Sequence, residues 1–344
     1  MKILISPLDW GLGHATRLIP IIKKLSDNGN DIIVAGNGKS FALIKKYFDN
    51  AQFIPFYSIH FKYSKNGLNI FNYFVIAFQI IWQTIYEHFK LKKIIKLYKI
   101  DIIISDNRYG LFNKNVKSYL ITHQLNVILP KYLSFANPLI NSYLKYYLKK
   151  YDQILIPDYQ AYNESLAGKL SHPSNYNKLP ISYIGPLSRF DKLCISKNEK
   201  QYDVVILISA PLSYCNLIVK ELSDFASLNT SISFAIISPY LFRSNHANLT
   251  IINSPDDIQW LSIVSNAKNI ISTAGYSTIM DLFLINKNAI LVPVKGQTEQ
   301  EYLANYLNNK YGSKKADSFN NAISHVLQKV QGTRYKVQGE SLNS

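Results

Sequence analysis

Residues that could bind a phosphate-bearing ligand are concentrated in one stretch of the chain, residues 269–307. Gly275 interrupts an apolar run typical of a buried strand, and Ser277 is placed to cap a helix that begins near Thr278. A second apolar run, Ala289–Val294, indicates a parallel strand buried on both faces. Because the first turn of a helix offers backbone N–H groups to anions, the pattern predicts a phosphate site.

Polar side chains follow both of these predicted strands. In an open α/β sheet, ligands bind outside the carboxyl ends of the strands, so we expect these side chains to line one pocket. The pattern favours a phosphate-bearing ligand with hydroxyl groups nearby. The residues concerned are Ser272, Thr273, Ser277, Thr278, Gln297, Glu299 and Gln300.

The same stretch resembles the donor-binding half of family 28 glycosyltransferases, which have the GT-B fold. That family includes the enzyme that adds N-acetylglucosamine to the peptidoglycan lipid precursor. The resemblance is carried by the Gly-Tyr-Ser-Thr turn at 275–278, by Asp281 and by the pair Glu299 and Gln300. It implies that Asp281 binds the ribose hydroxyls of a UDP-sugar and that the pair faces the sugar and phosphates. Gln297 is predicted to bind the donor beside them. The alternative is an ordinary βαβα unit with solvated polar loops.

Two segments depart from the family pattern. Thr273 and Ala274 stand where relatives commonly carry Arg-Ser, and loop 210–216 lacks the glycine-rich or arginine-bearing sequence that is usual there. We therefore expect helix-terminal N–H groups and the hydroxyls of Ser277 and Thr278 to hold the diphosphate.

A glycine loop ending in histidine occupies the start of the chain. Gly11 and Gly13 allow a tight turn and the close approach of a ligand, between a strand at 2–6 and a helix from about Ala15. The resemblance implies that His14 contacts an acceptor or donor phosphate, or acts as the general base. The alternative is a histidine that caps the helix.

Further polar residues end two more predicted strands. Asp106 follows the strand at 101–105, where a carboxylate could accept the proton of an acceptor hydroxyl or simply form an Asx-turn. His123 and Gln124 follow the strand at 118–122, where the resemblance implies acceptor recognition.

The organisation of the whole chain favours two α/β domains. The 344 residues are 47% hydrophobic, and short apolar runs alternate with helical patterns, as in parallel sheets. The resemblance implies the GT-B fold, two Rossmann-like domains facing a cleft. We expect an acceptor-binding domain at 1–188, a linker at 189–201, a nucleotide-sugar-binding domain at 202–330 and a frayed tail at 331–344.

The net charge of +16 and the isoelectric point near 9.5 allow two interpretations. An apolar stretch at 69–85 and a lysine cluster at 90–99 could lie against an anionic membrane surface, and 131–151 has a similar character. Alternatively, these are core helices, and the charge reflects a lysine-rich composition. No nucleic-acid-binding signature is present, so no nucleic-acid partner is expected.

The prediction is an inverting glycosyltransferase that needs no metal or cofactor and uses a UDP-sugar as donor substrate. The acceptor would be lipid-linked or part of the cell envelope. Two cysteines and an N-terminus that leads directly into a strand indicate a cytoplasmic location, with peripheral association at the inner membrane face. The alternatives are a sugar-nucleotide epimerase of the same fold, a degenerate protein that binds nucleotide-sugar without transfer, and a basic nucleic-acid-binding protein.

Overall fold

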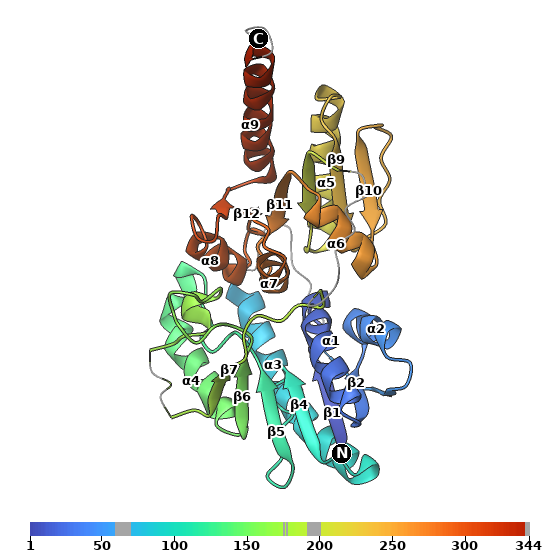
Figure 1. Ribbon diagram of the computed structural model, residues 1–344. Coiled ribbons are helices and arrows are strands. Elements are labelled where there is room, and N and C mark those ends of the chain that lie inside the picture. Colours follow the sequence, from blue (N-terminus) through green and yellow to red (C-terminus); the bar gives the residue numbers. More distant parts are fainter. Residues whose placement is uncertain (59–69, 175, 177, 191–200, 341–344) are drawn as a thin grey trace. The chain divides into compact units, whose positions relative to one another are not determined.

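The computed structural model describes residues 1–58, 70–174, 176, 178–190 and 201–340 (Figure 1). The chain forms two compact units: Met1–Asp191 with Ile279–Asp281, and Lys192–Thr278 with Leu282–Ser344. Most of the predicted linker lies at 191–200, outside the described residues.

Within the described residues, the first unit is built on a seven-stranded parallel sheet with the order β3-β2-β1-β4-β5-β6-β7. Its strands are β1 (Lys2–Pro7), β2 (Asp31–Gly36), β3 (Gln52–Pro55), β4 (Ile102–Asp106), β5 (Lys117–Ile121), β6 (Gln153–Ile156) and β7 (Ile181–Tyr183). Its helices are α1 (Leu12–Asp27), α2 (Gly38–Tyr47), α3 (Ile70–Tyr98) and α4 (Asn137–Leu148), with short 3₁₀ helices η1 (Lys131–Ala136) and η2 (Gly168–Leu170).

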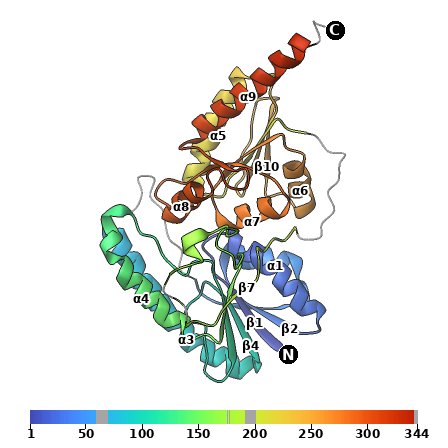
Figure 2. The same cartoon turned by 60° about the vertical axis from the view of Figure 1, so that its left-hand side comes forward.

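Helices cover both faces of this sheet, because its strands are apolar at consecutive positions and successive side chains point to opposite faces. Ile3 and Ile5 pack with α1 and α2 on one face, whereas Leu4 packs with Leu91 and Ile94 of α3 on the other. Helix α4 lies beside α3 (Figure 2) and packs over β5 and β6. The unit therefore has three layers, with its polar loops at the carboxyl edge of the sheet.

The second unit repeats this architecture on a six-stranded parallel sheet, counted over the described residues, with the order β10-β9-β8-β11-β12-β13. Its strands are β8 (Val204–Leu207), β9 (Phe234–Ser238), β10 (Leu249–Asn253), β11 (Asn269–Thr273), β12 (Ile290–Val292) and β13 (Lys314–Lys315). Its helices are α5 (Leu212–Leu228), α6 (Asp257–Ser265), α7 (Tyr276–Leu284), α8 (Thr298–Tyr306) and α9 (Phe319–Glu340).

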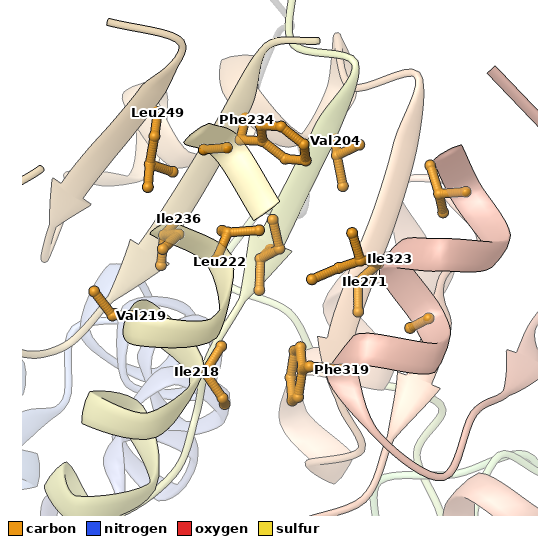
Figure 3. Close-up of a cluster of buried hydrophobic side chains, with 14 of the residues drawn as sticks. Val204, Ile218, Val219, Leu222, Phe234, Ile236, Leu249, Ile271, Phe319 and Ile323 are labelled. Atoms are coloured by element: carbon orange, nitrogen blue, oxygen red, sulfur yellow. The ribbon is translucent and has the colours of Figure 1, made fainter. Parts of the chain in front are cut away.

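Helices α5 and α9 pack side by side on one face of the second sheet. Figure 3 shows Ile218 and Leu222 of α5 and Phe319 and Ile323 of α9 converging on the strands around Ile271. This apolar layer fixes the sheet against which the predicted donor-binding loops are built.

The predicted fold class, α/β with two sheets of parallel strands, is confirmed. Some element bounds differ from those expected. Helix α7 begins at Tyr276, so Ser277 lies inside its first turn and is not its cap. Residues 331–340 of the predicted tail continue helix α9 although Gly332 and Gly339 are poor helix formers, since extending an existing helix costs less than starting one.

Candidate functional site

The first candidate site lies where strand order reverses in the first sheet. Strands β2 and β3 extend from one side of β1, and β4 pairs with its other side, with Pro7 of β1 opposite Asp106 of β4. Loops that leave two such strands diverge above the sheet, which makes this position the usual ligand site of the fold. The glycine loop that carries His14 and the loop that follows Asp106 both begin here.

His14 and Asp106, which were predicted as alternative bases, form one pair. The imidazole Nδ1 of His14 lies 3.0 Å from the Oδ1 atom of Asp106. The side chain of His14 is 15% exposed, while that of Asp106 is completely buried. Asp106 is therefore suited to orienting His14, and His14 is the member of the pair that can reach a substrate.

Arg17 completes the cluster, and sequence analysis missed it. Its Nε donates to Asp106 Oδ2 at 2.7 Å, and its Nη2 donates to Asp106 Oδ1. Nη2 also lies 2.7 Å from His14 Nδ1, and Nη1 lies 3.3 Å from Nδ1 of His123. A sequence signal existed, because a charged residue lies one helical turn after His14 among the apolar positions of α1.

These contacts set the charges of the cluster. Burial lowers the pKa of His14 below its ordinary value of 6.5; Asp106 acts against this shift and Arg17 adds to it. Burial raises the pKa of Asp106, but Arg17 and His14 outweigh that effect and hold it below the ordinary 3.8. At neutral pH, Asp106 is therefore ionised and paired with Arg17, while the imidazole of His14 is neutral.

The neutral imidazole has two possible tautomers, and each has its own chemistry. If Nδ1–H donates to Asp106, the Nε2 lone pair is free and His14 can accept a proton. If Nδ1 instead accepts from Arg17, Nε2 carries the hydrogen and His14 becomes a hydrogen-bond donor. Asp106 and Arg17 compete for the same imidazole nitrogen, so their balance decides whether His14 is a base.

The other predicted residues of this unit lie around the cluster. Gly11 is open, since a Cβ there would meet nothing within 4 Å, and its carbonyl accepts from Ser40 Oγ at 2.9 Å. His123 is only 4% exposed and lies against Arg17, and Gln124 beside it is half-buried. Their role in acceptor recognition stays a prediction, as does that of Gly13.

The second candidate site occupies the equivalent position in the second sheet, where β8 and β11 are neighbours and strand order reverses. A Cβ on Gly275 would meet only Thr278 Oγ1, at 4.0 Å, so a ligand has room to approach the backbone. Ser277 and Thr278 are half-buried in the first turn of α7. The turn therefore presents the hydroxyls and helix terminus that suit a phosphate group.

Two predicted donor-binding side chains already have protein partners. Asp281 is 7% exposed, and its Oδ1 accepts from Ser188 Oγ at 2.5 Å. Gln300 is also 7% exposed; its Oε1 accepts from the backbone N of Val294 at 3.1 Å and its Nε2 donates to Gln297 Oε1 at 2.7 Å. Gln300 thus holds the loop before α8 in shape, while Glu299 beside it is half-buried.

A cavity of about 450 Å³ opens elsewhere in the second unit, near β12, α5 and α8. Lys295 and Lys315 line it together with the carboxylates of Glu221, Glu301 and Asp317. Three acidic groups against two basic ones do not favour a diphosphate, and none of the predicted donor-binding residues lines the cavity.

The described residues contain neither a metal-binding cluster nor a membrane-spanning helix. No cluster of three or more His, Cys, Asp or Glu side chains could hold a metal ion. No helix within the described ranges has the length and apolar character required to cross a membrane.

Sequence comparison identifies the kind of protein this chain resembles. A model of the glycosyltransferase family 28 C-terminal domain matches residues 243–331, which include the whole stretch that carries the resemblance described above. Uncharacterized glycosyltransferases from Methanosarcina acetivorans and Methanosarcina mazei are 26% and 24% identical over 318 residues. In both cases this spans 88% of this chain and 82% of the relative. The predicted resemblance is confirmed.

Solved structures show the same fold. Phytolacca americana UGT2, complexed with UDP-2fluoro-glucose and pterostilbene, matches with a TM-score of 0.60 at 13% identity, over 96% of this chain and 89% of that chain. The spinosyn rhamnosyltransferase SpnG, complexed with thymidine diphosphate, matches with a TM-score of 0.62 at 10% identity, over 95% and 92%. The predicted GT-B fold is confirmed.

Replacing Arg17 by Met is expected to raise the pKa of His14. The substitution removes a positive charge that lowers this pKa and leaves Asp106 to pair with the imidazolium. NMR titration of labelled histidine, with the signal assigned through a His14→Gln variant, measures the change. Arg17→Lys is the control, because it keeps the charge and should keep the pKa near that of the wild type. A lower pKa in Arg17→Met would contradict this account of the cluster.

Proposed function

We propose that this chain, a family 28-like glycosyltransferase with the GT-B fold, moves a sugar from a UDP-sugar to a hydroxyl group of an acceptor. The sugar would be N-acetylglucosamine or another hexose. The observation that carries the proposal is the His14–Asp106–Arg17 cluster, a buried and charge-balanced group that exposes one imidazole edge at the carboxyl side of the sheet. Such a cluster suits general base catalysis.

The proposed reaction is a direct displacement with inversion. His14 Nε2 takes the proton of the acceptor hydroxyl while that oxygen bonds to the anomeric carbon of the donor sugar. The bond from this carbon to the diphosphate oxygen breaks, and UDP leaves with the electron pair. Asp106 stabilises the imidazolium, because a carboxylate beside it favours the charged form.

The leaving diphosphate would be stabilised by the first turn of α7. Its N-terminal N–H groups and the hydroxyls of Ser277 and Thr278 supply hydrogen bonds at the helix end. The proposal uses no cofactor or metal ion, and the UDP-sugar is a substrate.

The donor nucleotide is proposed to be a uridine and not a deoxyribonucleotide. A carboxylate at Asp281 can accept hydrogen bonds from two ribose hydroxyls, and a deoxyribose offers only one of them. Binding would require Ser188 to release Oδ1. The complex of SpnG with thymidine diphosphate makes thymidine diphosphate the useful competitor.

The acceptor is proposed to be lipid-linked, and the protein to work on the inner face of the cytoplasmic membrane. Helix α3 supports this, because large apolar side chains recur on its exposed side at spacings of three and four residues. They are Val75, Phe78, Trp82, Ile85 and Phe89. Phe78 is 70% exposed and Phe89 62%, and the exposed Lys92, Lys93 and Lys96 continue along the helix. Apolar area beside lysines is what an anionic bilayer surface attracts.

His14→Gln is expected to lower the release of UDP from UDP-N-acetylglucosamine at least ~100-fold, the range that general base catalysis contributes. UDP affinity, measured by calorimetry, should stay within error of the wild type. In the wild type the rate should fall as the pH drops below 6.5, because the pKa of His14 lies below that value and protonation removes the base. Wild-type turnover in the variant would exclude His14 as the base, and UDP binding without any turnover in the wild type would favour a degenerate binding protein.

Asp281→Asn is expected to weaken UDP binding about tenfold, the effect of losing ~1.4 kcal/mol of charge-assisted hydrogen bonding. The same change should weaken the binding of thymidine diphosphate less, because deoxyribose offers Asp281 only one hydroxyl. Ser188→Ala is the matched control, since it removes the partner of Asp281 and keeps the carboxylate. Equal UDP affinity in Asp281→Asn and the wild type would refute the assigned ribose contact.

Changing Lys92, Lys93 and Lys96 to Glu is expected to release the protein from anionic liposomes at low salt. Each lysine near the surface contributes ~1 kcal/mol, and salt should weaken wild-type binding by screening these charges. The control changes Lys23, Lys24 and Lys46, which are exposed on α1 and α2, to Glu and so alters the net charge equally. Sedimentation with the liposomes measures how much of each variant stays bound. Equal loss of binding in both variants would show an effect of net charge alone, without a membrane-binding face.

A further inference from the structure

A second buried charge cluster lies behind the His14–Asp106 pair, on the side of helix α3. Arg108 Nε donates to Glu87 Oε1 at 2.8 Å, and each of these side chains is about 1% exposed. Neither residue is among the predicted site residues. Because desolvating two charges costs about as much as their attraction returns, such a pair is weak evidence for a role in stability alone.

The guanidinium of Arg108 also holds two loop carbonyls. Nη1 donates to the carbonyl of Pro7 at 3.3 Å, and Nη2 donates to the carbonyl of Tyr57. The group lies over the ring of Phe56, 4.6 Å from its centroid. Pro7 is the last residue of β1, immediately before the glycine loop, so Arg108 fixes the point from which the loop to His14 departs.

Glu87 fastens the segment after Asp106 to α3. Its Oε2 accepts from the backbone N of Gly110 at 3.1 Å, and its Oε1 also accepts from Gln83 Nε2 at 2.6 Å. The packing is close, since a Cβ on Gly110 would lie 2.2 Å from the carbonyl oxygen of Thr84. The segment from Asp106 to Gly110 is therefore clamped on the helix at two places.

This clamp is directly connected to Asp106 through the backbone. Asn107, between Asp106 and Arg108, has a φ of 55°, a left-handed conformation that is unusual for a residue other than glycine. The carbonyl of Arg108 accepts from Ser105 Oγ at 2.6 Å and from Tyr151 OH at 2.8 Å. These hydrogen bonds hold the turn that follows Asp106 in this conformation.

We propose that Arg108 and Glu87 are positioning residues that hold the two loops carrying His14 and Asp106 in register for proton transfer. The inference rests on the proposed function and deepens it. Arg108 joins α3, the end of β1 and the segment after Asp106, so its fork geometry sets how closely Asp106 approaches the imidazole. A lysine at this position keeps the charge but cannot present the same planar fork.

The groups that face His14 come from three elements. Arg17 lies on α1, Asp106 ends β4 and His123 follows β5. Near Asp106, burial raises the pKa of Tyr109 to about 12, so its hydroxyl stays neutral. The charges that shift the pKa of His14 most are Asp106 and Arg17, so the influence that we propose for Arg108 and Glu87 is geometric.

Arg108→Lys tests the proposal through two readouts. UDP release from UDP-N-acetylglucosamine should fall about 10- to 100-fold with UDP affinity unchanged, since a misplacement of ~1 Å costs about 100-fold in rate. The NMR titration midpoint of His14 should fall, because contact with Asp106 raises this pKa and Arg17 remains to lower it. An unchanged or raised midpoint would overturn the proposal.

Leu91→Ala is the matched control, because Leu91 is fully buried one turn further along α3 and its loss destabilises the same helix without touching the ion pair. The His14 midpoint should stay at the wild-type value in this variant. A midpoint that falls equally in Leu91→Ala and Arg108→Lys would show only loss of stability and overturn the positioning role. If Arg108→Lys does not fold, Glu87→Gln, which keeps the acceptor atom and removes the charge, is measured against the same criterion.

The NMR titration of His14 tests this inference separately from the proposed function. It needs no substrate, so it decides the positioning role even if no UDP-sugar is turned over. If the wild type releases no UDP while the His14 midpoint moves in Arg108→Lys, the proposed activity fails and the positioning role stands.

Discussion

The buried pair of Arg17 and Asp106 is the interaction on which the first candidate site depends. A fully buried carboxylate is tolerated only when it is paired and hydrogen-bonded, and Asp106 meets both conditions through two donors from Arg17 and a contact with His14. Removing one partner of such a pair costs ~3–5 kcal/mol, because the other charge remains buried without compensation. The pair therefore fixes helix α1 to the end of β4, and His14 is held between them.

The same pair limits what His14 can do. Burial disfavours the imidazolium most, Asp106 favours it and Arg17 opposes it, so the pKa of His14 reflects burial together with two opposed charges. A histidine beside a carboxylate alone would hold its proton more firmly. Burial and Arg17 thus keep His14 neutral near pH 7, and Asp106 provides a carboxylate that stabilises the charge once a proton arrives.

The parallel-sheet topology supplies the second constraint. In each unit strand order reverses once within the described residues, between β1 and β4 in the first and between β8 and β11 in the second. Loops with glycine leave the sheet at both positions, at Gly11 and Gly275. Since the carboxyl ends of parallel strands meet at one edge, residues 92 positions apart in sequence, such as His14 and Asp106, become neighbours.

The sequence by itself determined the fold class, the principal strands and the residues around the glycine turns, because these depend on local patterns. Runs such as 101–105 and 153–156 are apolar enough to be read as strands, and the Gly-x-x-Thr turn with Asp281 is a local motif. Only the tertiary structure decided which of these residues meet. It joined His14 to Asp106, revealed Arg17 as their partner, and showed Gln300 bonded to its own loop. Long-range pairing of charges follows from strand order and burial, and neither can be predicted from the spacing of residues along the chain.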